Sequence, residues 1–90
     1  MAKVAILVRI LPEDAEIKPE DLYQRISQKL PEKYQIAQYQ SEPIAFGLEA
    51  LRMVILMPED VEGGTEEIES ILSEVPGVGQ VDVLSVSRIS

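Results

Sequence analysis

The chain has 90 residues, no cysteine, no histidine and a formal net charge of −8 at pH 7. Without these two residue types it lacks disulfide bonds, thiolate metal ligands and the usual general base near neutral pH, so we expect no catalytic residues, no metal site and no cofactor. The negative charge has the wrong sign for binding phosphates or an anionic bilayer, so we expect no direct nucleic-acid partner and no membrane partner.

The length is suited to one compact domain. Hydrophobic residues make up 46% of the chain, which is enough for a small core, and we expect residues 1–90 to form a single domain. The first apolar run is interrupted by charge and is too short for a secretory signal, and no segment approaches the length of a transmembrane span. These features predict a cytoplasmic protein.

The first two predicted elements are a strand and a helix. Apolar and other residues alternate over residues 3–11, which predicts a strand that ends at Pro12. Residues 19–30 predict an amphipathic helix, because Pro19 suits the first turn and Pro31 stops the helix. The apolar side chains that define the inner faces of both elements are Val4, Ile6, Val8, Ile10, Leu22, Ile26 and Leu30.

Two strands and a second helix follow. Residues 34–41 alternate weakly between prolines and favour a strand, and residues 48–57 alternate more strongly. Residues 66–75 carry apolar side chains at the spacing of a core-facing helix stripe, and Thr65 is suited to be its N-cap. The apolar residues that define these patterns are Tyr34, Ile36, Leu51, Met53, Ile55, Ile68, Ile71, Leu72 and Val75.

The last predicted element is a strand over residues 81–89. Its apolar side chains change face between Val83 and Leu84, which predicts a β-bulge. The resulting order, β-α-β-β-α-β, is typical of the ferredoxin-like α+β sandwich, a four-stranded antiparallel sheet with two helices on one face. The opposite face, which carries Arg9 and Arg52, is left for solvent or a partner.

Gly63 and Gly64 precede the second predicted helix and would allow a backbone cradle for a phosphate. A P-loop has lysine and serine or threonine after its last glycine, whereas here three glutamates occur within residues 66–69 and repel a phosphate. We therefore expect a turn that leads into the helix cap. The acidic stretch 59–74 is expected to be a solvated face, with steering of a basic partner as the alternative.

The segment that joins the second and third strands, residues 41–48, contains the chain's one phenylalanine, Phe46. Pro43 restricts the preceding residue to extended conformations, and Gly47 permits a sharp turn. The residues leave two interpretations open. Phe46 either packs under its loop as part of the core or anchors a protein partner, since aromatic side chains dominate interface energetics.

Three segments, residues 42–51, 63–69 and 81–89, resemble the archaeal form of the translation elongation factor 1-beta family. The likeness extends over nearly the whole chain, and the Ile-Ala-Phe-Gly sequence of the loop is its most specific part. The resemblance implies a guanine-nucleotide exchange factor for the GTPase elongation factor 1-alpha, active in protein synthesis without covalent chemistry. It also implies the β-α-β-β-α-β fold.

The resemblance further implies two groups of partner-binding residues. The first is the loop around the family's GTPase-contacting phenylalanine, which here comprises Ile44, Ala45, Phe46, Gly47 and Leu48. The second is Arg88 with Ile89, where eukaryotic relatives have a lysine that reaches the partner's magnesium site. Arginine is a departure because its guanidinium is larger and planar, and an exposed terminal charge is the alternative interpretation.

Two other functions use the same fold. A small regulatory ligand-binding module would need a pocket, usually at a dimer interface, whereas the exchange factor is expected to be a monomer when free. An acyl-phosphate hydrolase is a weaker alternative, because the chain has no asparagine for the arginine-plus-asparagine site that resemblance to that class implies.

Overall fold

The computed structural model describes residues 3–59 and 65–89 of the chain. Its elements are β1 (Lys3–Pro12), α1 (Pro19–Lys29), β2 (Gln35–Pro43), the short 3₁₀ segment η1 (Ala45–Gly47), β3 (Glu49–Pro58), α2 (Glu66–Ser73) and β4 (Val78–Ile89). The predicted β-α-β-β-α-β order is confirmed, and each predicted strand and helix is present with ends that differ from the prediction by at most three residues.

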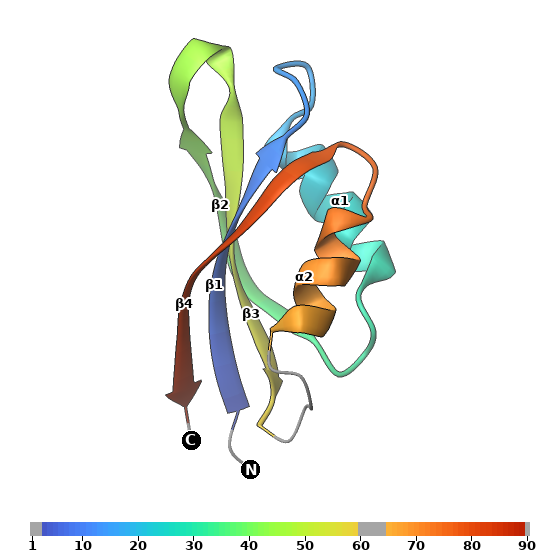
Figure 1. The fold of residues 1–90 in the computed structure, drawn as a ribbon, viewed down its shortest axis with the longest axis vertical. Coiled ribbons are helices and arrows are strands. Elements are labelled where there is room, and N and C mark those ends of the chain that lie inside the picture. Colours follow the sequence, from blue (N-terminus) through green and yellow to red (C-terminus); the bar gives the residue numbers. More distant parts are fainter. Residues whose placement is uncertain (1–2, 60–64, 90) are drawn as a thin grey trace.

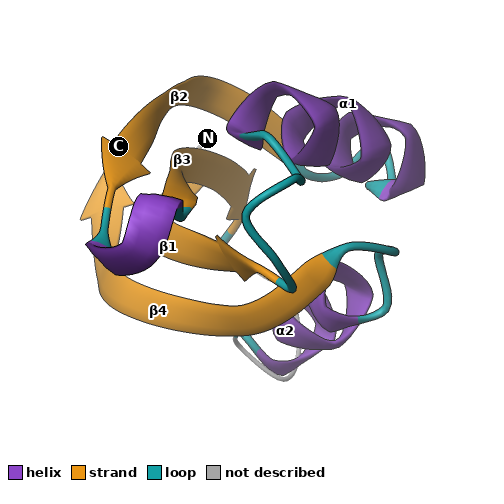
Figure 2. Ribbon diagram, turned by 90° about the horizontal axis from the view of Figure 1, so that it is seen from above, coloured by secondary structure: helices purple, strands orange, loops and turns teal. Residues whose placement is uncertain are grey.

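The four strands form one antiparallel sheet in the order β2-β3-β1-β4, so that β1 and β3 are central and β2 and β4 are the edges. Figure 2 shows both helices on the same side of the strands. This is the ferredoxin-like α+β arrangement predicted from the element order. The molecule is elongated, with principal extents of 41 × 19 × 18 Å, and the loop between β2 and β3 lies at the opposite end of the long axis from the two termini (Figure 1).

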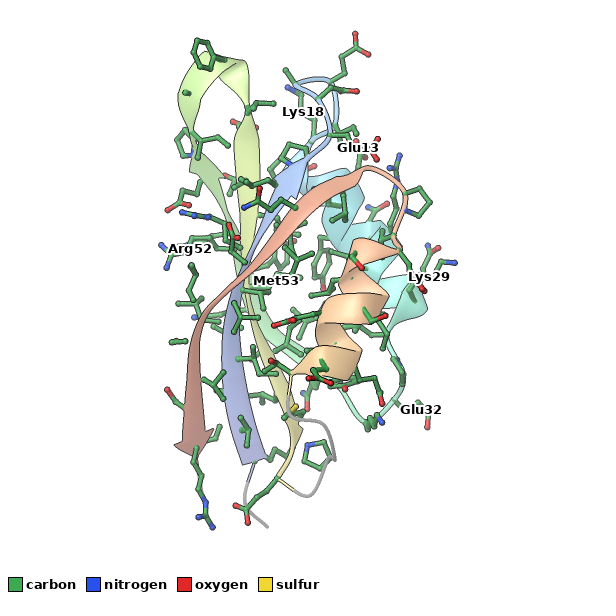
Figure 3. All side chains as sticks on the ribbon, in the orientation of Figure 1. Glu13, Lys18, Lys29, Glu32, Arg52 and Met53 are labelled. Carbon is green, nitrogen blue, oxygen red and sulfur yellow. The ribbon has the colours of Figure 1, made fainter. Side chains whose placement is uncertain are left out.

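The core lies between the sheet and the two helices. Alternate residues of the central strands face it, as predicted, and Figure 3 shows Met53 pointing towards the helices while Arg52 points away from them. The stacked rings of Tyr23 and Tyr39, with centroids 3.8 Å apart, add a contact between α1 and β2. The largest wholly buried side chains are Ile6, Val8, Ile10, Leu22, Ile26, Leu51, Met53, Ile55, Ile68 and Leu72.

The predicted β-bulge in β4 is confirmed. Ser85 pairs with Leu7 and Val83 pairs with Val8, so Leu84 has no partner in the register. The extra residue returns Val86 to the face of Val83, whereas uninterrupted alternation would place Val86 on the opposite face. The end of β4 extends past both helices (Figure 1), and Val86 remains 52% exposed.

The helix ends differ from the prediction in detail. The first helix ends at Lys29, and the Leu30 N–H caps it by donating to the Ile26 carbonyl at 3.0 Å. The second helix ends at Ser73, two residues earlier than expected, although Val75 is still buried. None of the helices in the described ranges is long and apolar enough to cross a membrane.

Thr65 occupies the N-cap position of α2, as predicted, but its side chain does not cap the helix. Its hydroxyl makes no capping hydrogen bond and instead donates to Glu69 Oε1 at 3.2 Å. The physical reason is the backbone of Thr65, which has φ −93° and ψ −1° and so is already helical, whereas a capping residue is normally extended. Gly63 and Gly64, the other part of this predicted turn, lie outside the described residues.

Candidate partner-binding site

The loop between β2 and β3 is a tight turn at the tip of a hairpin. Pro43 pairs with Glu49 at its base, and the Ile44 N–H then donates to the Leu48 carbonyl at 2.9 Å. The Leu48 N–H closes the tip by donating to the Ala45 carbonyl at 3.2 Å. Proline is tolerated at the end of β2 because β2 is an edge strand that needs no further donor there.

Phe46 adopts a left-handed backbone conformation, with φ 61° and ψ 35°. These angles match the first central position of a type I′ turn, and Gly47 follows with φ 76°. That turn suits the twist of a hairpin, but its first central position is normally occupied by asparagine, aspartate or glycine. A bulky side chain at this position costs about 1–2 kcal/mol of conformational free energy, so the turn is strained at Phe46, its aromatic residue.

The Phe46 side chain points into solvent. It is 95% exposed, the highest value among the exposed large hydrophobic side chains of the described residues. The interpretation in which Phe46 packs into the core therefore does not apply. Burial against a partner would remove a large apolar area from water, which is the property expected of an interface anchor.

A shallow hollow lies beside the Phe46 loop. It has a volume of about 430 Å³ and is formed where the hairpin tip meets the end of β1 and the start of β4. Its apolar lining comes from Ile44, Leu48, Leu11, Pro12 and Val78. The predicted loop residues thus border both a protruding ring and a concave apolar surface.

The second predicted group lies at the other end of the sheet. Arg88 pairs with Val4 and Ile89 pairs with Lys3, at the end of β1 that is farthest from the hairpin tip. The Arg88 side chain is 70% exposed, and its Nε lies 2.7 Å from Glu59 Oε2. The structure therefore does not bring the two predicted groups together.

Four charged side chains form a network on the open face of the sheet. Arg9 Nη2 lies 3.3 Å from Asp82 Oδ2, and Arg52 Nη1 lies 3.3 Å from Glu42 Oε1. Arg9 Nη1 also lies 3.8 Å from Glu42 Oε2, which joins the two pairs. The sequence identified the two arginines as open-face residues but not their carboxylate partners; Glu42 and Asp82 could have been found from their positions on the same face of the outer strands.

A separate polar cluster ties α2 to the turn before β2. The Tyr34 hydroxyl donates to Glu67 Oε1 at 3.2 Å, and Lys33 Nζ lies 2.8 Å from the same oxygen. Burial, with the Glu67 hydrogen bond and charge, raises the pKa of Tyr34 to about 12. The hydrogen bond from Lys33 is the main cause that lowers the pKa of Glu67. This cluster stabilises the fold and lies on the helix side, away from the predicted partner contacts.

No group of three histidine, cysteine, aspartate or glutamate side chains within residues 3–59 and 65–89 is arranged to hold a metal ion. The two ends of the sheet differ in chemistry: an exposed ring and an apolar hollow lie at one end, and an exposed guanidinium lies at the other.

Comparison with known proteins identifies the family of the chain. Residues 5–89 match the family model of the EF-1 guanine nucleotide exchange domain. The chain is 71% identical to elongation factor 1-beta of Thermofilum pendens over 90 residues, covering 100% of this chain and 99% of that protein. It is 52% identical to elongation factor 1-beta of Desulfurococcus amylolyticus, with 100% of both chains covered.

A likeness to solved structures concerns the fold alone. The C-terminal domain of the MgtC protein from Mycobacterium tuberculosis, solved in solution, superposes with a TM-score of 0.54 over 96% of this chain and 85% of that one. Its sequence is only 20% identical, so it supports the ferredoxin-like architecture and nothing about activity.

The fold and the family match define a guanine-nucleotide exchange domain. The chain belongs to the elongation factor 1-beta family, in agreement with the resemblance seen in its sequence, and its function is guanine-nucleotide exchange in translation elongation.

Proposed function

We propose that this protein accelerates GDP release from the GTPase elongation factor 1-alpha, and that residues 1–90 are one exchange domain. The observation that carries the proposal is the 95% exposed Phe46 ring, held at the hairpin tip in a left-handed conformation that costs free energy. A protein retains such strain where the surroundings hold it for a purpose, and contact with a partner supplies one.

The loop residues Ile44, Ala45, Phe46, Gly47 and Leu48 form the first contact in this proposal. The ring anchors the partner, and the hollow beside the loop accepts an apolar side chain from it. Arg88 and Ile89 form the second contact. The two contacts lie at opposite ends of the molecule, whose longest extent is 41 Å. A partner that touches both ends is at least that long.

The guanidinium of Arg88 supplies a cation at the second contact when its exposed ion pair with Glu59 opens. A cation placed beside the partner's magnesium site would compete electrostatically with Mg²⁺ and weaken the hold on the nucleotide phosphates. The exchange factor must bind the nucleotide-free partner more tightly than the GDP-bound one, because only differential affinity shifts the equilibrium. A tenfold weakening of GDP corresponds to about 1.4 kcal/mol of coupling.

This activity breaks and forms no covalent bond in the exchange factor. The free protein acts as a cytoplasmic monomer without a direct nucleic-acid contact, which agrees with its net charge of −8.

The test is the release of fluorescent GDP from the cognate elongation factor 1-alpha, with Mg²⁺ and excess unlabelled nucleotide. We expect clear acceleration at substoichiometric amounts of this protein. No acceleration by a folded, matched pair would refute the proposal and redirect the search to a small-molecule ligand.

A further inference from the structure

The ion-pair network on the open face crosses the whole sheet through one side chain of each strand. Its members are Asp82 on β4, Arg9 on β1, Arg52 on β3 and Glu42 on β2. Glu42 is the member closest to the Phe46 loop, because it pairs with Ala50 next to the base of the hairpin.

The network is sheltered although no helix covers this face. Each of the four side chains is only about one-third exposed, between 27% and 36%. The Nε atoms of Arg9 and Arg52 and the Oε2 atom of Glu42 are buried and have no hydrogen-bond partner among the described residues, so Glu42 is hydrogen-bonded to Arg52 and held to Arg9 by charge alone. The four side chains find most of their charge partners within the network itself.

The two arginines need the carboxylates. Arg9 and Arg52 are direct cross-strand neighbours, and like charges in that arrangement repel each other. Glu42 lies within ion-pair distance of both guanidinium groups, whereas Asp82 reaches only Arg9. Loss of the Glu42 charge would leave Arg52 without its carboxylate partner. The repulsion between Arg9 and Arg52 would then be less well compensated, at a position on β3, one of the two strands that carry the loop.

The Phe46 loop depends on its stem. The ring itself is almost fully exposed, and the strained turn is closed by two backbone hydrogen bonds, Ile44 N–H to Leu48 and Leu48 N–H to Ala45. A loop that is already held in its binding conformation loses less entropy when a partner binds. The entropy that the loop loses on binding therefore depends on how firmly β2 and β3 are held below it.

We propose that Glu42, clamped by Arg52 and Arg9, is a positioning residue that holds the hairpin stem and presents Phe46 to the partner. This inference rests on the proposed function, since it assigns the network a role in the same contact. Glu42 itself contacts no partner atom and acts through the backbone of the loop.

The first test compares Glu42→Gln with the unaltered protein in the GDP-release assay. The substitution keeps the shape of the side chain and removes its charge. We expect the concentration that gives half-maximal acceleration to rise about fivefold, as for the loss of a modest ion pair, while the maximal rate is unchanged because the Arg88 end is intact. Glu42→Asp, which keeps the charge, is expected to restore part of the loss.

Glu67→Gln is the matched control. It removes an ion pair of similar exposure, Lys33 to Glu67 at 2.8 Å with side chains 40% and 42% exposed, on the helix side of the molecule. We expect it to change neither the half-maximal concentration nor the maximal rate. An equal loss in both variants would overturn the positioning role, because it would show a general effect of lost stability.

The second test needs no partner and is the amide hydrogen exchange of Ile44 and Leu48 in the free protein. We expect both amides to exchange severalfold faster in Glu42→Gln, while those of Val8 and Met53 in the central strands are unchanged. Unchanged loop amides would overturn the inference, as would faster loop amides with an unaltered half-maximal concentration. If the unaltered protein fails to accelerate GDP release, the proposed function fails instead, and the amides still decide whether Glu42 holds the loop.

Discussion

Phe46 and Arg88 lie at opposite ends of the same sheet. Phe46 is at the tip of the β2–β3 hairpin, beside the end of β1 at Pro12, whereas Arg88 pairs with Val4 at the start of β1. The ten residues of β1 span about 33 Å as an extended strand, which sets the scale of the separation. The two contacts are therefore separable by mutation, because a change at one end has no direct path to the other.

Replacement of Phe46 tests the anchor. Phe46→Ala is expected to keep the fold, because the ring is exposed, and to weaken exchange about tenfold or more, in line with loss of an interface anchor of about 1.4 kcal/mol. Phe46→Asn separates the two effects better, because asparagine tolerates the left-handed conformation. The free energy of unfolding of this variant is expected to equal that of the unaltered protein or to exceed it by up to about 1 kcal/mol. Urea unfolding and GDP release measure the two effects. An active Phe46→Asn protein would contradict the anchor.

Arg88 is expected to control the maximal rate. Arg88→Ala should lower the rate of GDP release at saturating exchange factor, while stability changes by no more than about 0.5 kcal/mol because the ion pair with Glu59 is exposed. Arg88→Lys keeps the cation and should retain most of the rate. Full activity of Arg88→Ala would leave this side chain as an exposed terminal charge.

Two glycines in left-handed conformations provide a matched stability test. A Cβ at Gly77, where φ is 94°, would lie 2.5 Å from Arg25 Nη1, the atom that donates to the Pro76 carbonyl at 2.8 Å. The Arg25 side chain can move aside but then gives up this hydrogen bond, so the lost bond and the backbone strain together are expected to lower the free energy of unfolding of Gly77→Ala by about 2–3 kcal/mol. A Cβ at Gly47, where φ is 76°, would meet nothing within 4 Å, so Gly47→Ala should cost only the backbone strain of about 1–2 kcal/mol. Equal losses in chemical denaturation would show that the Arg25 contact is unimportant.

Tyr34 should make stability depend on alkaline pH. Its pKa is about 12 in the folded protein and 10.0 in its ordinary environment, so the folded state holds the proton more tightly. The stabilisation is fully present below pH 10 and is lost as the pH rises towards 12, by about 1–3 kcal/mol. Unfolding measured across this range should show a smaller decline for Tyr34→Phe, which has no proton to lose. Identical slopes for the two proteins would contradict the prediction.

Periodicity was sufficient for the elements and for the faces of the central strands, whereas bulges change the faces within the edge strands β2 and β4. Alternation on β1 identified Ile6, Val8 and Ile10 as core residues, and they are wholly buried. The change of apolar face at Leu84 correctly indicated a bulge. These features are local, because side-chain direction follows from the period of the strand or helix within a few residues.

The residue types did not predict the details at the ends of two elements, α2 and β2. Thr65 is of a residue type that favours N-caps, but its backbone is already helical, and its hydroxyl donates to the Glu69 carboxylate and not to a backbone acceptor. Pro43, expected to end β2 from outside, is its last residue and pairs with Glu49 across the hairpin. Neither outcome follows from the residue type alone, because both depend on the backbone conformation and on the segments of the same chain that lie nearby.

The element order, the core faces of the central strands, the charge and the family of the chain could all be read from the order of its residues. The exposure of Phe46, the position of Arg88 at the other end of the molecule and the link from Glu42 to Arg9 and Arg52 became visible only in the folded chain. The reason is physical: periodicity reports which face a residue occupies, whereas exposure and ion pairing depend on strand order and register, which bring together residues far apart in the chain.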